Sequence, residues 1–286
     1  MWIAYAFGSA FFAGVTAILA KCGIEKTDST VATALRTVVV LIFSWLLVFI
    51  VGSQGQVTHI DGKTWCFLIL SGLSTGASWL CYFRALQLGD IHKVVPIDKS
   101  STVLTILLAA LLLGEPIGWF QAVSILIMAL GTYWMVQKPK GEVTSKGGKS
   151  WFFYALASAI FASLVSILDK IGIEGVESNL GTALRTGVVL IMAWLMIPIQ
   201  GKTKELRQIP RRELLFIFLS GLATGASWLC YYRALQEGPA SIVAPIDKLS
   251  ILVTIFFARV VFREKLARKE LWGLIFIVAG TLGLLL

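Results

Sequence analysis

The chain has 286 residues, of which 57% are hydrophobic and 14% charged, and its formal net charge is +9. Its mean hydropathy of +0.82 is well above that of water-soluble domains, which excludes an ordinary soluble protein and makes the lipid bilayer the expected solvent. The positive charge does not indicate a nucleic-acid partner, because the lysines and arginines lie mostly in short loops between apolar segments, where they orient membrane proteins.

Apolar segments follow one another along the whole chain, each close to the roughly 20 residues that cross a hydrocarbon core about 30 Å thick. The first has no basic residues before it and no convincing cleavage site after it, so we interpret it as a retained helix. Hydropathy predicts an all-α integral membrane protein with ten transmembrane helices, at residues 2-20, 31-51, 65-86, 93-113, 119-137, 151-170, 180-199, 213-236, 240-262 and 269-286.

An internal duplication is the strongest feature of the sequence. A shift of 149 residues aligns the two halves without a gap, and SGLSTGASWLCYFRALQLG at 71-89 matches SGLATGASWLCYYRALQEG at 220-238 at 16 of 19 positions. TALRT (33-37 and 182-186) and PIDK (96-99 and 245-248) also recur. We therefore divide the chain into two five-helix repeats, 1-137 and 151-286, joined by a polar, basic linker at 138-150.

Five crossings in each repeat require equivalent helices to run in opposite directions, so the sequence predicts inverted repeats. Equivalent loops then face opposite sides of the membrane, and their charges should differ. The loops at 52-64 and 114-121 hold one basic residue, whereas their counterparts at 201-213 and 263-270 hold nine. By the positive-inside rule, the basic loops are cytoplasmic in a multi-pass protein of the cell membrane.

The inverted five-helix units, with LGEP at 113-116 after the fourth helix and a glycine-containing fifth helix, resemble the EamA-type transporters of the drug/metabolite transporter superfamily. The blocks GxxTGxSWLCYxRALQxG and APIDKLS are similar to half-length EamA-type proteins, so the chain resembles two such units fused. The resemblance implies ten helices around a central cavity, a substrate site at the repeat interface and alternating access.

Charged residues inside the predicted spans need a reason, because a charge at the bilayer centre costs at least about 2.5 kcal/mol. The third and fourth helices of each repeat are antiparallel neighbours, so Arg84 could pair with Asp98, and Arg233 with Asp247. Arg36 and Arg185 lie closer to a helix start, where snorkelling to the interface would explain them. His59 and His92 are expected in loops or at the interface, and no metal site is predicted.

The candidate substrate-binding residues are the charged and aromatic side chains that recur in both repeats. An Asp-Lys pair suits a zwitterion, although adjacent helical residues point about 100° apart. Pro96 and Pro245 are expected to kink the fourth helices beside these pairs. Glycines four apart, at 72 and 76 and again at 221 and 225, predict close helix packing. The candidates for the substrate site are Trp79, Tyr82, Asp98 and Lys99, with Trp228, Tyr231, Asp247 and Lys248.

The sequence favours a secondary carrier, because it contains no GxxxxGK[ST] loop for ATP. Export of an amino acid or related metabolite is the specific hypothesis. It rests on the resemblance and on the Asp-Lys pairs. A multidrug cation exporter would place a carboxylate in the first helix, and residues 1-20 contain none. A flippase for lipid-linked intermediates and a non-transporting membrane scaffold are also compatible with the sequence.

No nucleophile, base and orienting group gather at a recognisable spacing, so an enzyme is not expected, and neither is a cofactor. The expected partners are a small-molecule substrate and membrane lipid. The sequence leaves open a coupling proton or ion and a homodimer.

Overall fold

A computed structural model of the protein describes residues 2-113, 117-136, 150-172, 176-237, 246-247, 249-264 and 266-284. These residues form α-helices, two short 3-10 helices and connecting loops, and no strand occurs among them. The predicted all-helical class is confirmed for this part of the chain.

The helices of the two halves are described in chain order and follow the predicted spans to within about one helical turn. The first half contains α1 (Trp2–Gly23), α2 (Ser29–Val51), η1 (Ser53–His59), α3 (Gly62–Leu88), α4 (Ile91–Lys99), α5 (Ser101–Leu113) and α6 (Trp119–Val136). The second half contains α7 (Ser150–Gly172), α8 (Ser178–Ile199), η2 (Glu205–Arg207), α9 (Arg211–Glu237), α11 (Ser250–Val261) and α12 (Arg268–Gly283).

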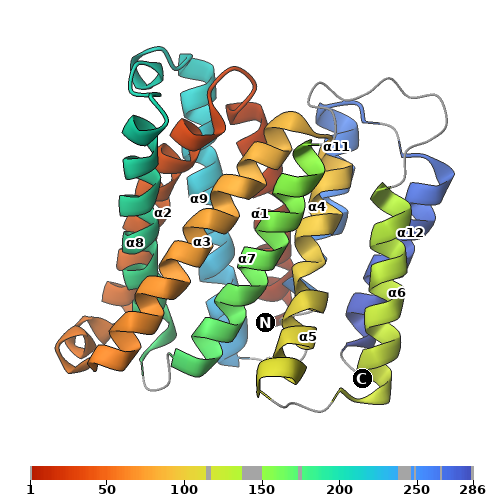
Figure 1. Ribbon diagram of the computed structural model, residues 1–286, viewed down its shortest axis with the longest axis horizontal. Helices are drawn as coiled ribbons and strands as arrows, with labels where there is room; N and C mark the ends of the chain where they lie inside the picture. The colour runs from red at the N-terminus through yellow and green to blue at the C-terminus, as the bar shows by residue number, and fades with distance from the viewer. Residues whose placement is uncertain are drawn as a thin grey trace.

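Two predicted spans differ from single continuous helices. The span 93-113 is divided at Ser100 into α4 and α5, which follow one another along the bundle (Figure 1). Of the span 240-262, only residues 246-247 and those from 249 onward are described, and α11 covers its second part.

The outer surface of the bundle is apolar, as a bilayer requires. Leu111, Trp119 and Ile199 have 79%, 78% and 73% of their surface exposed, which a water-soluble protein would avoid on such a scale. Counting α4 and α5 as one segment, the described residues contain eight helices long and apolar enough to cross a membrane, with α11 as a shorter apolar helix. The chain is therefore a multi-pass membrane protein, and the count of ten crossings stays a prediction.

Short polar side chains cap the N-termini of helices at positions where the apolar pattern of the sequence is interrupted. Asp28 accepts the N–H of Thr30 at 2.8 Å at the start of α2, and Asp61 accepts that of Thr64 at 2.9 Å at the start of α3. Gly52 ends α2 with a φ of 77°, a left-handed conformation that glycine adopts without steric cost. These caps satisfy helix-terminal groups that would otherwise be left unpaired.

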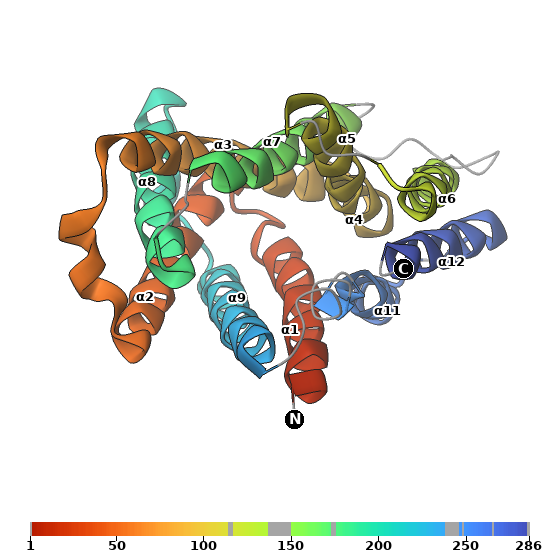
Figure 2. The ribbon, with the colours of Figure 1, turned by 90° about the horizontal axis from the view of Figure 1, so that it is seen from below.

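The two halves are interleaved, because the most extensive helix pairs join one half to the other. These pairs are α1 with α9, α3 with α7, α2 with α8, and α6 with α12. Figures 1 and 2 show α6 and α12 side by side at one edge of the bundle, and α3 beside α7. Neither half therefore forms a separate body with its own core.

Glycines allow the halves to approach closely, and they do so reciprocally. A Cβ added at Gly72 of α3 would lie 2.6 Å from Cβ of Val188 on α8, and one at Gly221 of α9 would lie 2.7 Å from Cβ of Val39 on α2. These two contacts are equivalent under the 149-residue shift. The predicted close packing at these glycines is confirmed, and it occurs between the halves.

Helices α6 and α12 pack in opposite directions through glycine contacts of the same kind. Gly131 of α6 faces the backbone of Gly273, near the start of α12, whereas Gly280, near its end, faces the backbone of Ser124 on α6. Later residues on each helix thus meet earlier residues on its partner. Equivalent helices of the two repeats therefore run antiparallel at this contact.

Candidate functional site

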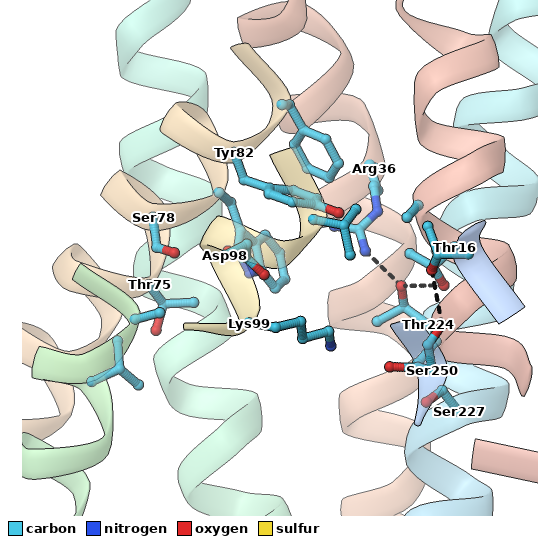
Figure 3. A pocket seen from close by; sticks show the side chains of 18 of the residues that line it. Thr16, Arg36, Thr75, Ser78, Tyr82, Asp98, Lys99, Thr224, Ser227 and Ser250 are labelled. Atoms are coloured by element: carbon cyan, nitrogen blue, oxygen red, sulfur yellow. Dashed lines mark hydrogen bonds between the residues drawn. The ribbon is translucent and has the colours of Figure 1, made fainter. Parts of the chain in front are cut away.

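A cavity of about 390 Å³ lies between the two halves (Figure 3). Its lining comes from α1, α2, α3 and α4 in the first half and from α7, α8, α9 and α11 in the second. Most of the polar side chains are hydroxyls, and the charged ones are Arg36, Asp98, Lys99 and Arg185. The volume is within the range of about 300–1,000 Å³ that is typical of small-molecule sites.

The fourth helix of the first repeat is interrupted beside the cavity. Pro96 lies inside α4, which ends at Lys99. The Ser100 N–H donates to the carbonyls of Pro96 at 3.0 Å and Ile97 at 3.1 Å, and its hydroxyl donates to the Ile97 carbonyl at 2.6 Å. Asp98 and Lys99, the last two residues of α4, both line the cavity. Pro245, the equivalent proline, lies outside the described residues.

Five of the eight predicted substrate-binding candidates line the cavity, namely Trp79, Tyr82, Asp98, Lys99 and Trp228. Tyr231 instead packs against the buried cluster of Ala6, Ala234 and Ile246. Asp247 is not among the described residues that line the cavity, and Lys248 lies outside the described part of the chain. The structure thus brings together the candidates of the first repeat with Trp228 of the second.

The two aspartates are held in equivalent ways by serines of the opposite half. The hydroxyl of Ser158 on α7 donates to Asp98 Oδ1 at 3.0 Å, and that of Ser9 on α1 donates to Asp247 Oδ1 at 2.6 Å. The Oγ of Ser158 also lies 3.2 Å from that of Ser78 on α3, and the Oγ of Ser9 lies 3.2 Å from that of Ser227 on α9. Both carboxylates are therefore positioned at contacts between the repeats.

The predicted ion-pair residues have other surroundings. Arg84 Nη1 donates to Gln87 Oε1 at 2.6 Å, one turn along the same helix, so the structure gives Arg84 a different partner from the expected Asp98. Arg233, its equivalent on α9, is exposed. Its pairing with Asp247 stays a prediction.

Arg36 is a cavity residue, and the expectation that it snorkels to the interface is wrong. Only 6% of its surface is exposed, and it donates hydrogen bonds to hydroxyls of Ser220 and Thr224 on α9. Its guanidinium also lies over the rings of Trp79 and Phe83. Position near a helix start suggested an exposed arginine, but the recurrence of TALRT in both halves was a signal that the residue is built into the core.

A buried ionic cluster joins the halves at one end of the bundle, which the sequence analysis did not foresee. His92, expected in a loop or at the interface, is 6% exposed in the first turn of α4. Its Nδ1 lies 2.7 Å from Glu264 Oε2 and its Nε2 lies 3.3 Å from Glu270 Oε1. Lys21 Nζ, at the end of α1, lies 2.9 Å from Glu264 Oε1. The interaction partners of His92 come from residues 172 and more positions away, which no local pattern reveals.

Electrostatics at this cluster favour the charged form of Glu264, which lies in the loop between α11 and α12. Burial alone would raise the pKa of its carboxyl. The hydrogen bond with His92 and the charges of Lys21 and His92 outweigh this and lower the pKa of Glu264 to about 2. The carboxylate also accepts the N–H groups of Ile91 and His92, each at 3.1 Å, which helps to cap the start of α4.

Comparisons with known proteins agree with this architecture. The model of the EamA-like transporter family matches residues 1-137 and again residues 149-286. A transporter from a Sinorhizobium species, described as "Uncharacterized transporter in cobO 3'region", is 44% identical over 134 residues, which are 47% of this chain and 95% of that relative. That relative thus corresponds in length to about half of this chain.

A solved structure described only as "Crystal structure of protein" shares the fold. It aligns over 97% of this chain and 94% of its own length, with a TM-score of 0.64 and 16% identity. The two matches to the family model cover nearly the whole chain, and the resemblance noted from the sequence is confirmed. The chain belongs to the EamA-like transporter family and is a multi-pass membrane transporter.

Proposed function

We propose that the protein is a secondary transporter that exports an amino acid or a related small polar metabolite. The observation that carries the proposal is the cavity of about 390 Å³, which is lined by both halves and by charges of both signs. A carboxylate, three cationic side chains and several hydroxyls suit a cargo that bears an acidic and a basic group. Aromatic rings of Trp79, Tyr82 and Trp228 supply apolar walls for the rest of the cargo.

Alternating access follows from inverted repeats of five helices each, ten in all, that exchange equivalent conformations. Three features support this part of the proposal: the reciprocal glycine contacts between the halves, the antiparallel packing of α6 and α12, and the interrupted fourth helix beside the cavity. Interrupted helices at a substrate site and repeats that rock against one another are common to several transporter folds.

The function is tested by transport into liposomes. We expect purified protein in proteoliposomes to exchange a labelled amino acid for an unlabelled one, and Asp98→Asn to lower the rate at least 10-fold, because the amide cannot attract the amino group of the cargo as a charge. Asp61→Asn is the matched control, since Asp61 is an exposed helix cap and asparagine caps equally well.

Two results would contradict the proposal. If the proteoliposomes move no amino acid and no amine, the proposal of amino acid transport is wrong. Stabilisation of the purified protein by long-chain lipid phosphates would then favour a flippase. Full transport by Asp98→Asn would show that this carboxylate does not contact the cargo.

The inverted topology predicts that equivalent loops are labelled from opposite sides. Gln54 and Thr203 are equivalent under the 149-residue shift, and both are exposed. After replacement of the four native cysteines, a membrane-impermeant thiol reagent is expected to label Gln54→Cys in intact cells and Thr203→Cys only after permeabilisation. Labelling of both positions from the same side would rule out inversion between these loops.

A further inference from the structure

Arg36 contacts two other helices at the cavity. Its Nε donates to Ser220 Oγ at 3.0 Å and its Nη2 to Thr224 Oγ1 at 2.5 Å, both on α9. The guanidinium carbon lies 4.9 Å from the ring centroid of Trp79 and 5.0 Å from that of Phe83, both on α3. Aromatic faces on one side and hydroxyls on another determine how the guanidinium is oriented.

These contacts orient the guanidinium but do not neutralise it. Serine and threonine hydroxyls are uncharged, and no carboxylate forms an ion pair with Arg36 among the residues that the structure describes. A guanidinium has five N–H donors, and in the described structure the Nη1 nitrogen has no hydrogen bond. A buried charge without an opposite partner is costly, so Arg36 has the properties of a residue that receives its partner from outside the protein.

A second polar side chain that lines the cavity has a hydroxyl without a hydrogen bond among the described residues. Ser250, the first residue of α11, is 1% exposed, and its hydroxyl has no hydrogen bond among the described residues. Buried hydroxyls are nearly always hydrogen-bonded in folded proteins. Figure 3 shows Arg36, Thr224 and Ser250 around the same cavity.

The charge of the described lining favours an anion. Arg36, Lys99 and Arg185 are cationic, whereas Asp98 is the one carboxylate among the described lining residues. A cargo without an acidic group would leave the guanidinium of Arg36 uncompensated. Among the described lining residues, cationic side chains outnumber carboxylates, which favours ligands that bring at least one negative charge.

We propose that Arg36 is the anion-binding residue of the transport site and that it binds the carboxylate of the cargo, with the Ser250 hydroxyl as a further hydrogen-bond donor to it. This inference rests on the proposed function and narrows it. The transporter accepts compounds with an acidic group and rejects amines that lack one. A planar guanidinium suits this role because it can donate two parallel hydrogen bonds to one carboxylate.

The test is a set of thermal-stability measurements on the purified full-length protein in detergent, since a ligand that binds the folded state raises the melting temperature. The probes are the twenty amino acids, the amines that lack their carboxylates, the acids that lack their amino groups, and inorganic phosphate. We expect wild type to be stabilised by amino acids and acids but not by the matched amines.

Arg36→Gln is expected to bind these ligands about 10- to 100-fold more weakly, the effect of losing a hydrogen bond to a charged group. Arg36→Lys keeps the positive charge but lacks the two parallel N–H donors of a guanidinium, so its affinity should lie between those of wild type and Arg36→Gln. Ser250→Ala should weaken binding by a smaller factor than Arg36→Gln does. Arg84→Gln is the control, because it removes an arginine that bonds within α3 and lies away from the cavity lining. It should bind as wild type does.

Each outcome distinguishes this inference from the proposed function. Unchanged acid binding in Arg36→Gln, or equally tight binding of matched amines by wild type, would overturn the role of Arg36 while amino acid transport could still stand. Binding of acids or phosphate but not of amino acids, lost in Arg36→Gln, would support the anion site and contradict amino acid transport. If wild type binds no anion in the panel, both fail. If Arg36→Gln does not fold, Arg36→Lys and Ser250→Ala decide by the same criteria.

Discussion

Replacing Gly131 by alanine is expected to destabilise the folded protein by about 1–3 kcal/mol, the usual cost of overpacking a close contact. A Cβ at this position would lie 2.6 Å from the Gly273 carbonyl oxygen and 2.8 Å from the Ile277 backbone nitrogen. Both are backbone atoms of α12, so no side-chain rotation relieves the clash. Helices α6 and α12 would have to move apart along their contact.

The same substitution at Gly187 provides the control. This glycine lies within α8, and a Cβ there would meet nothing within 4 Å. Because alanine is a better helix former than glycine by about 1 kcal/mol, Gly187→Ala should be neutral or slightly stabilising. Thermal unfolding of the two purified variants in detergent measures both effects. Equal melting temperatures would mean that the close approach of α6 and α12 does not contribute to stability.

Replacing Glu264 by glutamine is expected to cost about 2–3 kcal/mol of stability, somewhat less than the 3–5 kcal/mol typical of breaking a fully buried ion pair, because the cluster is partly exposed. Glu264 and Lys21 are 11% and 18% exposed. The substitution leaves Lys21 and His92 without their shared carboxylate.

The contribution of Glu264 to stability depends on pH with a definite sign. The pKa of Glu264 is lowered from its ordinary 4.5 to about 2 in the folded protein. Its contribution to stability is therefore fully present above about pH 4.5 and is lost as the pH falls towards 2. The melting temperature of wild type should fall more steeply than that of Glu264→Gln in this range. Glu270, which also faces His92, is present in both proteins, so the observable is the difference between the two curves.

Glu205→Gln is the matched control, since Glu205 is an exposed glutamate in the neighbouring basic loop. It should leave both the melting temperature and its pH dependence unchanged. Coincident curves of melting temperature against pH for wild type and Glu264→Gln would show that the Glu264 carboxylate does not stabilise the fold.

Prediction from the sequence worked best where the signal is local or repeated. Apolar runs placed nearly every described helix, since crossing a bilayer requires about 20 consecutive apolar residues. Glycines that recur in both repeats marked close helix packing, and the PIDK motif marked residues at the cavity. The interruption at Ser100 was suggested by Pro96, but the sequence did not show that Asp98 and Lys99 would both line the cavity.

The expectations that failed concerned partners distant in the sequence. Arg36 was assigned to the membrane interface because it lies near a helix start, whereas its hydroxyl partners are 184 and 188 residues away on α9. For His92, expected in a loop or at the interface, the sequence did not reveal the burial against two glutamates of the opposite repeat.

The sequence by itself determined that the protein is a duplicated, all-helical membrane protein, because hydropathy and self-similarity are properties of the chain and do not depend on how its helices pack. The resemblance to EamA-type transporters came from its motifs, such as LGEP at 113-116. Only the tertiary structure decided which charged side chains line the cavity and which form the buried ionic cluster at one end of the bundle. The reason is physical: a charge in the membrane is tolerated through its neighbours, and here those neighbours come from the other repeat.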